Sequence, residues 1–125
     1  MKIKEVKKLN VYNRVVELLP QLSTNAKLPT KKYFRKILKS KNSHFFVAKI
    51  DKKVIGTLLL VKYNTLCGSK YWIEDVIIDE SQRGRGYGKE ITQFAIDYAK
   101  SDGASSIYLT SQPARIAANE LYKKL

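Results

Sequence analysis

Apolar positions in the first third of the chain recur at helical spacing. Over 11–19 they fall at every third or fourth residue, which predicts an amphipathic helix that ends at Pro20. Over 31–39 the spacing returns with a strongly basic opposite face, and Thr30 is placed to cap this helix. Its expected apolar face consists of Tyr33, Phe34, Ile37 and Leu38. Residues 1–7 alternate weakly, as in a short edge strand.

From position 45 the pattern changes to apolar, β-branched runs. The runs 45–50 and 54–63 are joined by Asp51-Lys52-Lys53, which predicts an antiparallel hairpin. A turn region over 64–69 then leads to a third run, 70–78. We therefore expect three consecutive antiparallel strands.

A helix and a crossover strand are expected after these three strands. Helical spacing returns over 86–100, and the residues expected to face inward are Ile91, Phe94, Ala95, Tyr98 and Ala99. Residues 106–110 then form a short strand, which a helical crossover would place parallel to 70–78. A last helix is expected over 114–124.

This order of elements predicts one mixed α/β domain over 1–125 with a central, mostly antiparallel sheet flanked by helices. With 125 residues and 44% hydrophobic residues, the chain can bury a core, which excludes wholesale disorder. The longest apolar run, 54–61, is too short to span a membrane, and the N-terminus has no apolar signal region. We therefore expect a cytoplasmic protein.

The net charge of +13 favours polyanionic partners. The lysines are spread along the whole chain, so a solvated basic surface is favoured over a dedicated nucleic-acid face. A basic nucleic-acid-binding module remains the alternative of a different class. His44 and Cys67 are each the single residue of their type, so neither a disulfide nor a metal site is expected.

The most informative stretch is 71–91, where an apolar strand is followed by a glycine-rich basic turn and a helix start. Three glycines in Arg83-Gly84-Arg85-Gly86-Tyr87-Gly88 allow positive φ and close approach of a ligand. Successive N–H groups form an anion-binding nest, and the helix N-terminus adds roughly half a positive charge behind it. The lysine and serine or threonine of a P-loop are missing.

The chain resembles the GNAT superfamily of N-acetyltransferases in three places. The turn over 83–88 fits the family's Q/R-x-x-G-x-G/A loop, and the strand Glu74-Asp75-Val76-Ile77-Ile78 precedes it at the family's spacing. Asn119-Glu120-Leu121-Tyr122 looks like the family's Asn and Tyr on the last helix. The resemblance implies the acyl-CoA N-acyltransferase fold and acetyl-CoA as co-substrate, with an acetyl group passing to a primary amine by direct attack.

The same resemblance implies roles for individual residues. Backbone groups of Val76, Ile77 and Ile78 would pair with the pantetheine arm of coenzyme A. The pyrophosphate would be held by N–H groups of the loop, whose residues are Arg83, Gly84, Arg85, Gly86, Tyr87 and Gly88, with Lys89 close by. Asn119 would hydrogen-bond pantetheine or a bridging water, and Tyr122 would protonate the leaving thiolate.

Glu74 is the first choice for a general base. In a regular strand it shares a face with Val76 and Ile78, whereas Asp75 points the other way unless a bulge exchanges the two. A chain of water molecules could replace either carboxylate.

The chain departs from the family after the Tyr122 helix, because the family's two further strands are not present before Leu125. A shortened chain, a homodimer that supplies the missing sheet edge, or an exposed edge would each explain this. A catalytically inactive GNAT fold that binds coenzyme A is therefore a further alternative.

Overall fold

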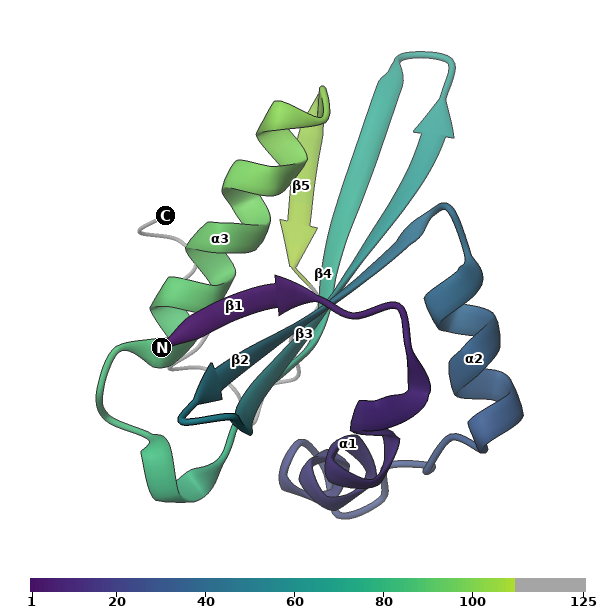
Figure 1. Ribbon diagram of the computed structural model, residues 1–125. Helices are drawn as coiled ribbons and strands as arrows, with labels where there is room; N and C mark the ends of the chain where they lie inside the picture. Colours follow the sequence, from purple (N-terminus) through teal and green to yellow (C-terminus); the bar gives the residue numbers. More distant parts are fainter. Residues whose placement is uncertain (110–125) are drawn as a thin grey trace.

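The computed structural model describes residues 1–109 and contains a five-stranded sheet. Helices lie on both faces of this sheet (Figure 1). The strands lie side by side in sequence order, and only the last neighbouring pair is parallel. They are β1 (Lys2–Glu5), β2 (Ser43–Ile50), β3 (Lys53–Thr65), β4 (Gly68–Ile78) and β5 (Ser106–Leu109). The predicted antiparallel strands and the parallel crossover are confirmed.

The helices are divided between the two faces of the sheet. In Figure 1, α1 (Tyr12–Leu18) and α2 (Lys31–Lys39) lie on one side, and α3 (Tyr87–Ser101) lies on the other. Short 3-10 turns occur at η1 (Leu9–Val11), η2 (Leu19–Gln21) and η3 (Glu80–Gln82). The predicted cap of α2 is confirmed, because the Thr30 hydroxyl accepts a hydrogen bond of 3.1 Å from the Tyr33 N–H.

The predicted stop at Pro20 is wrong in detail. The chain keeps helical backbone angles through η2, where Pro20 occupies the first turn. Proline is tolerated there because a residue in the first turn of a helix needs no N–H for an intrahelical bond.

Each face of the sheet has its own hydrophobic core, because side chains alternate along the strands. Phe46, Leu58, Leu60 and Ile73 pack on the α3 side, and Val15, Phe34, Phe45 and Val47 pack on the α1/α2 side.

Two predicted inward-facing residues lie at the margins of these cores. Tyr33 is 56% exposed and Phe94 is 37% exposed. On α3 the buried stripe runs along Ile91, Ala95 and Ala99 and includes Thr92 and Ile96, so Phe94 lies at its edge and touches Phe46.

The β2–β3 link is shorter than predicted, because Ile50 already pairs with Lys53. Asp51 and Lys52 have φ values of 49° and 70°, as a two-residue hairpin turn requires.

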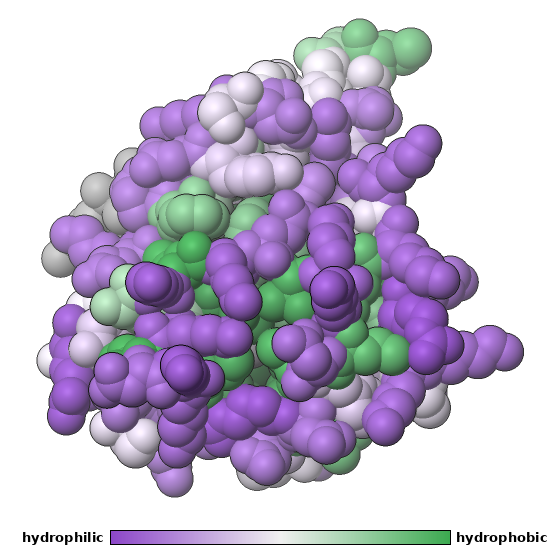
Figure 2. All heavy atoms as spheres, viewed as in Figure 1, coloured by the Kyte–Doolittle hydropathy of each residue, from purple (hydrophilic) through white to green (hydrophobic). Residues whose placement is uncertain are grey.

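Figure 2 shows hydrophilic side chains over most of one side of the molecule, with apolar atoms between them. Apolar atoms also project at the top of this view, over the β3–β4 hairpin, where Leu66 is fully exposed. Within residues 1–109, no helix is both long enough and apolar enough to cross a membrane.

Candidate functional site

A bulge in β4 is the feature around which the candidate site is built. Thr57 pairs with Ile77 but Leu59 pairs with Glu74, so β4 has one more residue than β3 in this interval. Asp75 has a φ of +52°, and its carbonyl accepts a hydrogen bond of 3.0 Å from the hydroxyl of buried Thr57. A non-glycine residue in this region of backbone space is strained, and such strain occurs mostly at functional sites.

The bulge overturns the predicted orientation of Glu74. Glu74 pairs with Leu59 on the α1/α2 side, whereas Val76 and Ile78 pack against the α3-side core. Beyond the bulge, Ile77 joins the α1/α2-side core. The extra residue reverses the alternation, so Glu74 does not share a face with Val76 and Ile78.

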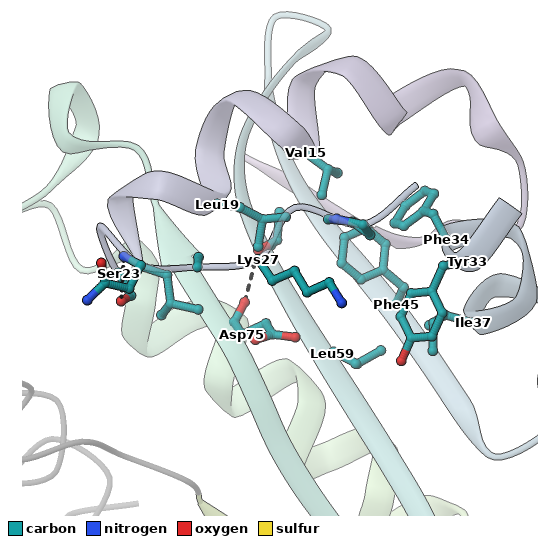
Figure 3. A pocket seen from close by; sticks show the side chains of 15 residues that line it. Val15, Leu19, Ser23, Lys27, Tyr33, Phe34, Ile37, Phe45, Leu59 and Asp75 are labelled. Carbon is teal, nitrogen blue, oxygen red and sulfur yellow. Dashed lines mark hydrogen bonds between the residues drawn. The ribbon is translucent and has the colours of Figure 1, made fainter. Parts of the chain in front are cut away.

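Asp75 lines a cavity of about 680 Å³ between the sheet, α1, α2 and the loop that joins these helices. Figure 3 shows its side chain on the same side of the sheet as Leu59 and below Lys27. The other walls come from η2, the loop over 22–29, α2 and strands β2 and β3. The sequence pattern does not predict this cavity, because its walls come from seven segments spread from α1 to β4.

The glycine-rich turn follows the bulged strand after the short turn η3. Gly84 and Gly86 both have a φ of +81°, and Gly86 is the N-cap of α3 without a side-chain hydrogen bond. The first backbone N–H groups of a helix have no intrahelical acceptor, so the start of α3 can bind an anion. Nothing lies within 4 Å of the position that a Cβ would take at either glycine. The loop residues 83–86 and Lys89 are exposed, so this turn is open to a ligand.

The third glycine of the motif differs from the other two. Gly88 lies within α3, and a Cβ there would make an ordinary contact of 3.7 Å with Ile78. Positive φ is therefore required at two of the three glycines that the sequence suggested.

The Arg83 side chain points back toward the end of β4. Its Nε donates to the Ile78 carbonyl at 2.9 Å, and its Nη2 lies 3.4 Å from Oε1 of Gln21. The Arg83 side chain thus fixes the start of the turn in this structure. On the other edge of β4, the Asp79 N–H donates to the Ile55 carbonyl at 2.7 Å. Because successive N–H groups in a strand face opposite edges, the Ile78 N–H faces away from β3.

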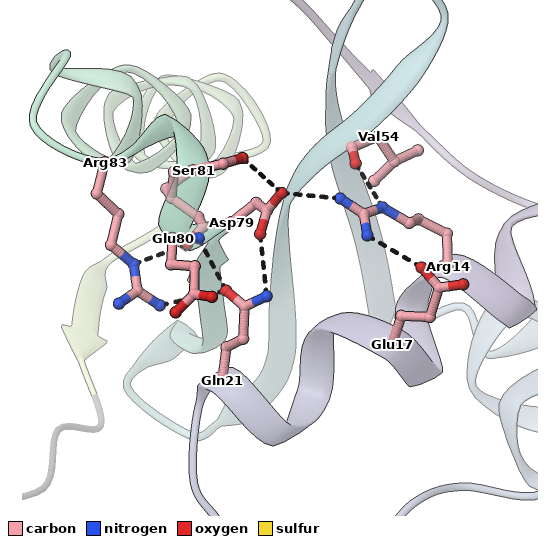
Figure 4. Close-up of polar contacts among 9 residues, drawn as sticks. Arg14, Glu17, Gln21, Val54, Asp79, Glu80, Ser81 and Arg83 are labelled. Carbon is pink, nitrogen blue, oxygen red and sulfur yellow. Dashed lines mark hydrogen bonds and ion pairs between the residues drawn. The ribbon is translucent and has the colours of Figure 1, made fainter.

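A polar network connects the turn with the helices on the α1/α2 side (Figure 4). The buried Asp79 carboxylate accepts hydrogen bonds from Gln21, Ser81 and Arg14 at 3.0, 2.9 and 3.1 Å. The Gln21 side chain also accepts a 2.9 Å hydrogen bond from the Glu80 N–H. The hydrogen bonds from Gln21 and Ser81, then the Arg14 guanidinium, lower the pKa of Asp79 to about 2 despite burial.

Asn119, Tyr122 and the predicted last helix lie outside the described residues. His44 lies in a structural network, because its Nδ1 is 2.9 Å from Glu5 and 3.2 Å from the Tyr98 hydroxyl. Cys67 is exposed at the tip of the β3–β4 hairpin. Within residues 1–109, no group of three or more His, Cys, Asp or Glu residues could hold a metal ion.

Comparison with curated proteins gives remote relatives that are acetyltransferases. The chain is 25% identical over 117 residues to a glucosamine 6-phosphate N-acetyltransferase from Arabidopsis thaliana, covering 84% of this chain and 78% of that protein. It spans 55%, 39% and 42% of the length of three further curated relatives.

Solved structures share the fold. A transcriptional regulator from Bacillus halodurans C-125 superposes with a TM-score of 0.86 at 26% identity, over 98% of this chain and 89% of that one. An aminoglycoside acetyltransferase from an uncultured soil metagenomic sample, solved with sisomicin, gives a TM-score of 0.86 at 18% identity. That match covers 98% of this chain and 85% of the other.

The family model of the acetyltransferase (GNAT) family matches residues 12–125, which is most of the chain and includes both the bulged strand and the glycine-rich turn. The chain belongs to the acetyltransferase (GNAT) family.

Proposed function

We propose that the protein transfers an acetyl group from acetyl-CoA to a primary amine by direct attack, without an acetyl-enzyme. The observation that carries this proposal is the position of β4. Its bulge at Asp75 lines a cavity on the α1/α2 side, and the same strand leads through Asp79 and the short turn η3 to the glycine-rich turn at Arg83. One strand thus connects a pocket for an acceptor with a turn suited to phosphate.

The proposed cofactor half consists of β4 and the start of α3. Backbone groups of Val76, Ile77 and Ile78 hold the pantetheine arm. The N–H groups from Arg83 to Gly88 hold the pyrophosphate, supported by the positive end of the α3 dipole and by Lys89. Asn119 hydrogen-bonds the pantetheine arm or a bridging water. Because Arg83 is bonded to Ile78 and Gln21, its guanidinium contributes mainly by fixing the loop.

The proposed reaction begins with a neutral amine. A free lysine-type amine has a pKa of about 10.4, so its ammonium must lose a proton to a carboxylate or to a water chain. The amine nitrogen then attacks the thioester carbonyl. The C–N bond forms, the C–S bond breaks, and the nitrogen loses a second proton as it becomes an amide. The sulfur keeps the bonding electrons and takes a proton, so the net release is one proton. The products are an amide and free coenzyme A, with one proton released from the original ammonium.

Three groups of this chain are assigned to these steps. Glu74 or Asp75 accepts the proton of the ammonium, since the bulge turns both toward the α1/α2 side. The Ile78 N–H stabilises the charge that develops on the carbonyl oxygen, because it faces away from β3 and is not used in the β3–β4 pairing. Tyr122 donates a proton to the thiolate.

Calorimetry with acetyl-CoA and coenzyme A tests the cofactor half, and release of free thiol with a panel of amines tests the transfer. We expect saturable binding of both ligands and amine-dependent thiol release. No heat with either ligand at millimolar concentration would reject the proposal. Salt-sensitive binding of RNA without any response to coenzyme A would favour the nucleic-acid alternative instead.

A further inference from the structure

The residues of the cavity wall restrict the chemical class of amine that the cavity can bind. Ten of the fifteen lining residues are aliphatic, aromatic or proline, and three of them carry rings of phenylalanine or tyrosine. Phe34 and Phe45 pack edge to face with their centroids 5.5 Å apart and form a buried part of the wall. Tyr33 stands beside them and is 56% exposed, so its ring is accessible to a ligand.

Charge inside the cavity is sparse. Among the described lining residues, Asp75 is the one carboxylate and Lys27 is the one cation. Asp75 is in the bulge of β4, the proposed cofactor strand itself, and Lys27 of the loop between α1 and α2 lies above it in Figure 3. The one described carboxylate that attracts a cationic amine is therefore on the strand at which the proposed acetyl transfer takes place.

We infer that the acceptor is a singly charged primary amine attached to an apolar, ring-bearing body, which the cavity binds with its amine toward Asp75. This inference rests on the proposed function and specifies its substrate class. The body is bound by burial of apolar surface and by ring contacts with Tyr33, Phe34 and Phe45. As in the proposed reaction, one proton of the ammonium is released for each amide formed.

Two other acceptor classes fit the wall less well. A polyamine such as an aminoglycoside brings several ammonium groups, which one carboxylate cannot pair in a protein of net charge +13. An amino-sugar phosphate brings a dianion and several hydroxyls. It would meet a single lysine and a mainly apolar wall, where unpaired polar groups are costly.

The test compares 2-phenylethylamine and tryptamine with glucosamine 6-phosphate and sisomicin as acceptors for the full chain with acetyl-CoA. We expect kcat/KM for the two arylalkylamines to exceed that for either polar acceptor by roughly tenfold or more, as desolvation of unpaired polar groups predicts. Higher kcat/KM for glucosamine 6-phosphate or sisomicin overturns the inference but leaves the proposed function in place. Absence of acetyl-CoA binding in calorimetry overturns the proposed function and this inference with it.

Variants separate the cavity from the rest of the surface. Tyr33→Ala should raise KM for 2-phenylethylamine by roughly fivefold, the loss of one ring contact, while leaving the Kd of acetyl-CoA unchanged. Tyr63→Ala is the matched control, because Tyr63 is also exposed, at 41%, and does not line the cavity. Equal KM values for the two variants would contradict the inference.

Lys27→Met should change KM in the direction opposite to that expected for Tyr33→Ala. Removing this cation should lower KM for 2-phenylethylamine, because one repulsive charge leaves the cavity. For an acceptor held by its phosphate, the same change would raise KM. A raised KM for the arylalkylamine, or no acetylation of either arylalkylamine by protein that binds acetyl-CoA, overturns the inference.

Discussion

Arg14 of α1 and Asp79, the residue after β4, are joined by an ion pair of 3.1 Å between Nη2 and Oδ2. The same arginine donates from Nε to the Val54 carbonyl at 2.9 Å, so its position is fixed both by β3 and by the residue after β4. The Asp79 carboxylate also accepts hydrogen bonds from the side chains of Gln21 and Ser81. These bonds fix the start of the glycine-rich turn relative to the α1/α2 layer. The cavity side and the loop side of the site are thus mechanically connected.

This network predicts a loss of stability in acid. The pKa of Asp79 is lowered to about 2 by Gln21, Ser81 and Arg14, from an ordinary value near 3.8. A lowered carboxyl pKa stabilises the folded state above the unfolded-state value, and the contribution is lost as the pH falls through the folded-state value. We expect the midpoint of urea unfolding to fall between about pH 4 and pH 2 for this reason.

Asp79→Asn should remove that part of the acid dependence and lower stability at pH 7 by roughly 1–3 kcal/mol, because the charged acceptor of a buried network is lost. Asp97→Asn is the control, since Asp97 is an exposed carboxylate on α3 whose side chain accepts from Gln93. Urea titrations from pH 2 to pH 7 measure both. An acid profile of Asp79→Asn identical to that of the wild type would show that the network does not control acid stability.

Thr57 and Thr92 offer a matched pair for testing the bulge. Both are buried, but the Thr57 hydroxyl donates to the Asp75 carbonyl, whereas that of Thr92 has no hydrogen-bond partner among residues 1–109. Thr57→Val should cost about 1 kcal/mol and raise KM for the amine, because the bulge that orients Asp75 loses its hydrogen bond. Thr92→Val should be neutral or stabilising, since it replaces an unsatisfied hydroxyl with a methyl group. Thermal unfolding and steady-state kinetics of both variants give the comparison.

The order of strands and helices was predictable because it follows from hydrophobic spacing. The glycine-rich turn was recognisable from its three glycines, and the resemblance added its expected role in binding coenzyme A. The bulge was not predictable from spacing, since Asp75 interrupts an otherwise regular strand pattern with an αL backbone. One signal was present in Gly56, within the apolar run of β3. A Cβ there would lie 2.7 Å from the Ile78 side chain and 3.0 Å from the Ile77 carbonyl, so the glycine marks the close approach of β4.

The cavity and the Asp79 network could not be predicted from the sequence either, but for a different reason than the bulge. Gln21 and Asp79 are 58 positions apart, and neither belongs to a recognisable motif. Contacts of this kind depend on how η2 docks on the sheet, which periodicity does not specify. The predicted roles of Asn119 and Tyr122 rest on the resemblance alone.

The glycines of the turn predict opposite effects on folding and binding. Gly86→Ala places a Cβ on a residue with a φ of +81° and should destabilise the fold by about 1 kcal/mol. Gly88→Ala lies inside α3 with an ordinary contact, so it should raise stability by up to about 1 kcal/mol. If the pyrophosphate contacts the backbone here, Gly88→Ala should nonetheless weaken acetyl-CoA binding by roughly tenfold or more. Thermal unfolding with calorimetry separates the two effects, and an unchanged Kd in Gly88→Ala would remove Gly88 from the proposed binding site.

The last prediction distinguishes the two carboxylates of the bulged strand. Asp75 lines the cavity beside Lys27 and Leu59, whereas Glu74 pairs with Leu59 and does not line it. If Asp75 receives the ammonium, Asp75→Asn should raise KM for the amine by roughly tenfold, and asparagine tolerates the αL backbone at this position. If Glu74 is the base, Glu74→Gln should instead lower kcat by roughly 100-fold and flatten the alkaline rise of kcat, with KM almost unchanged. The pH profiles of kcat and KM for the two variants, with acetyl-CoA saturating, measure this division of roles. Unchanged kinetics in both variants would leave proton removal to a water chain and would exclude both carboxylates from the transfer.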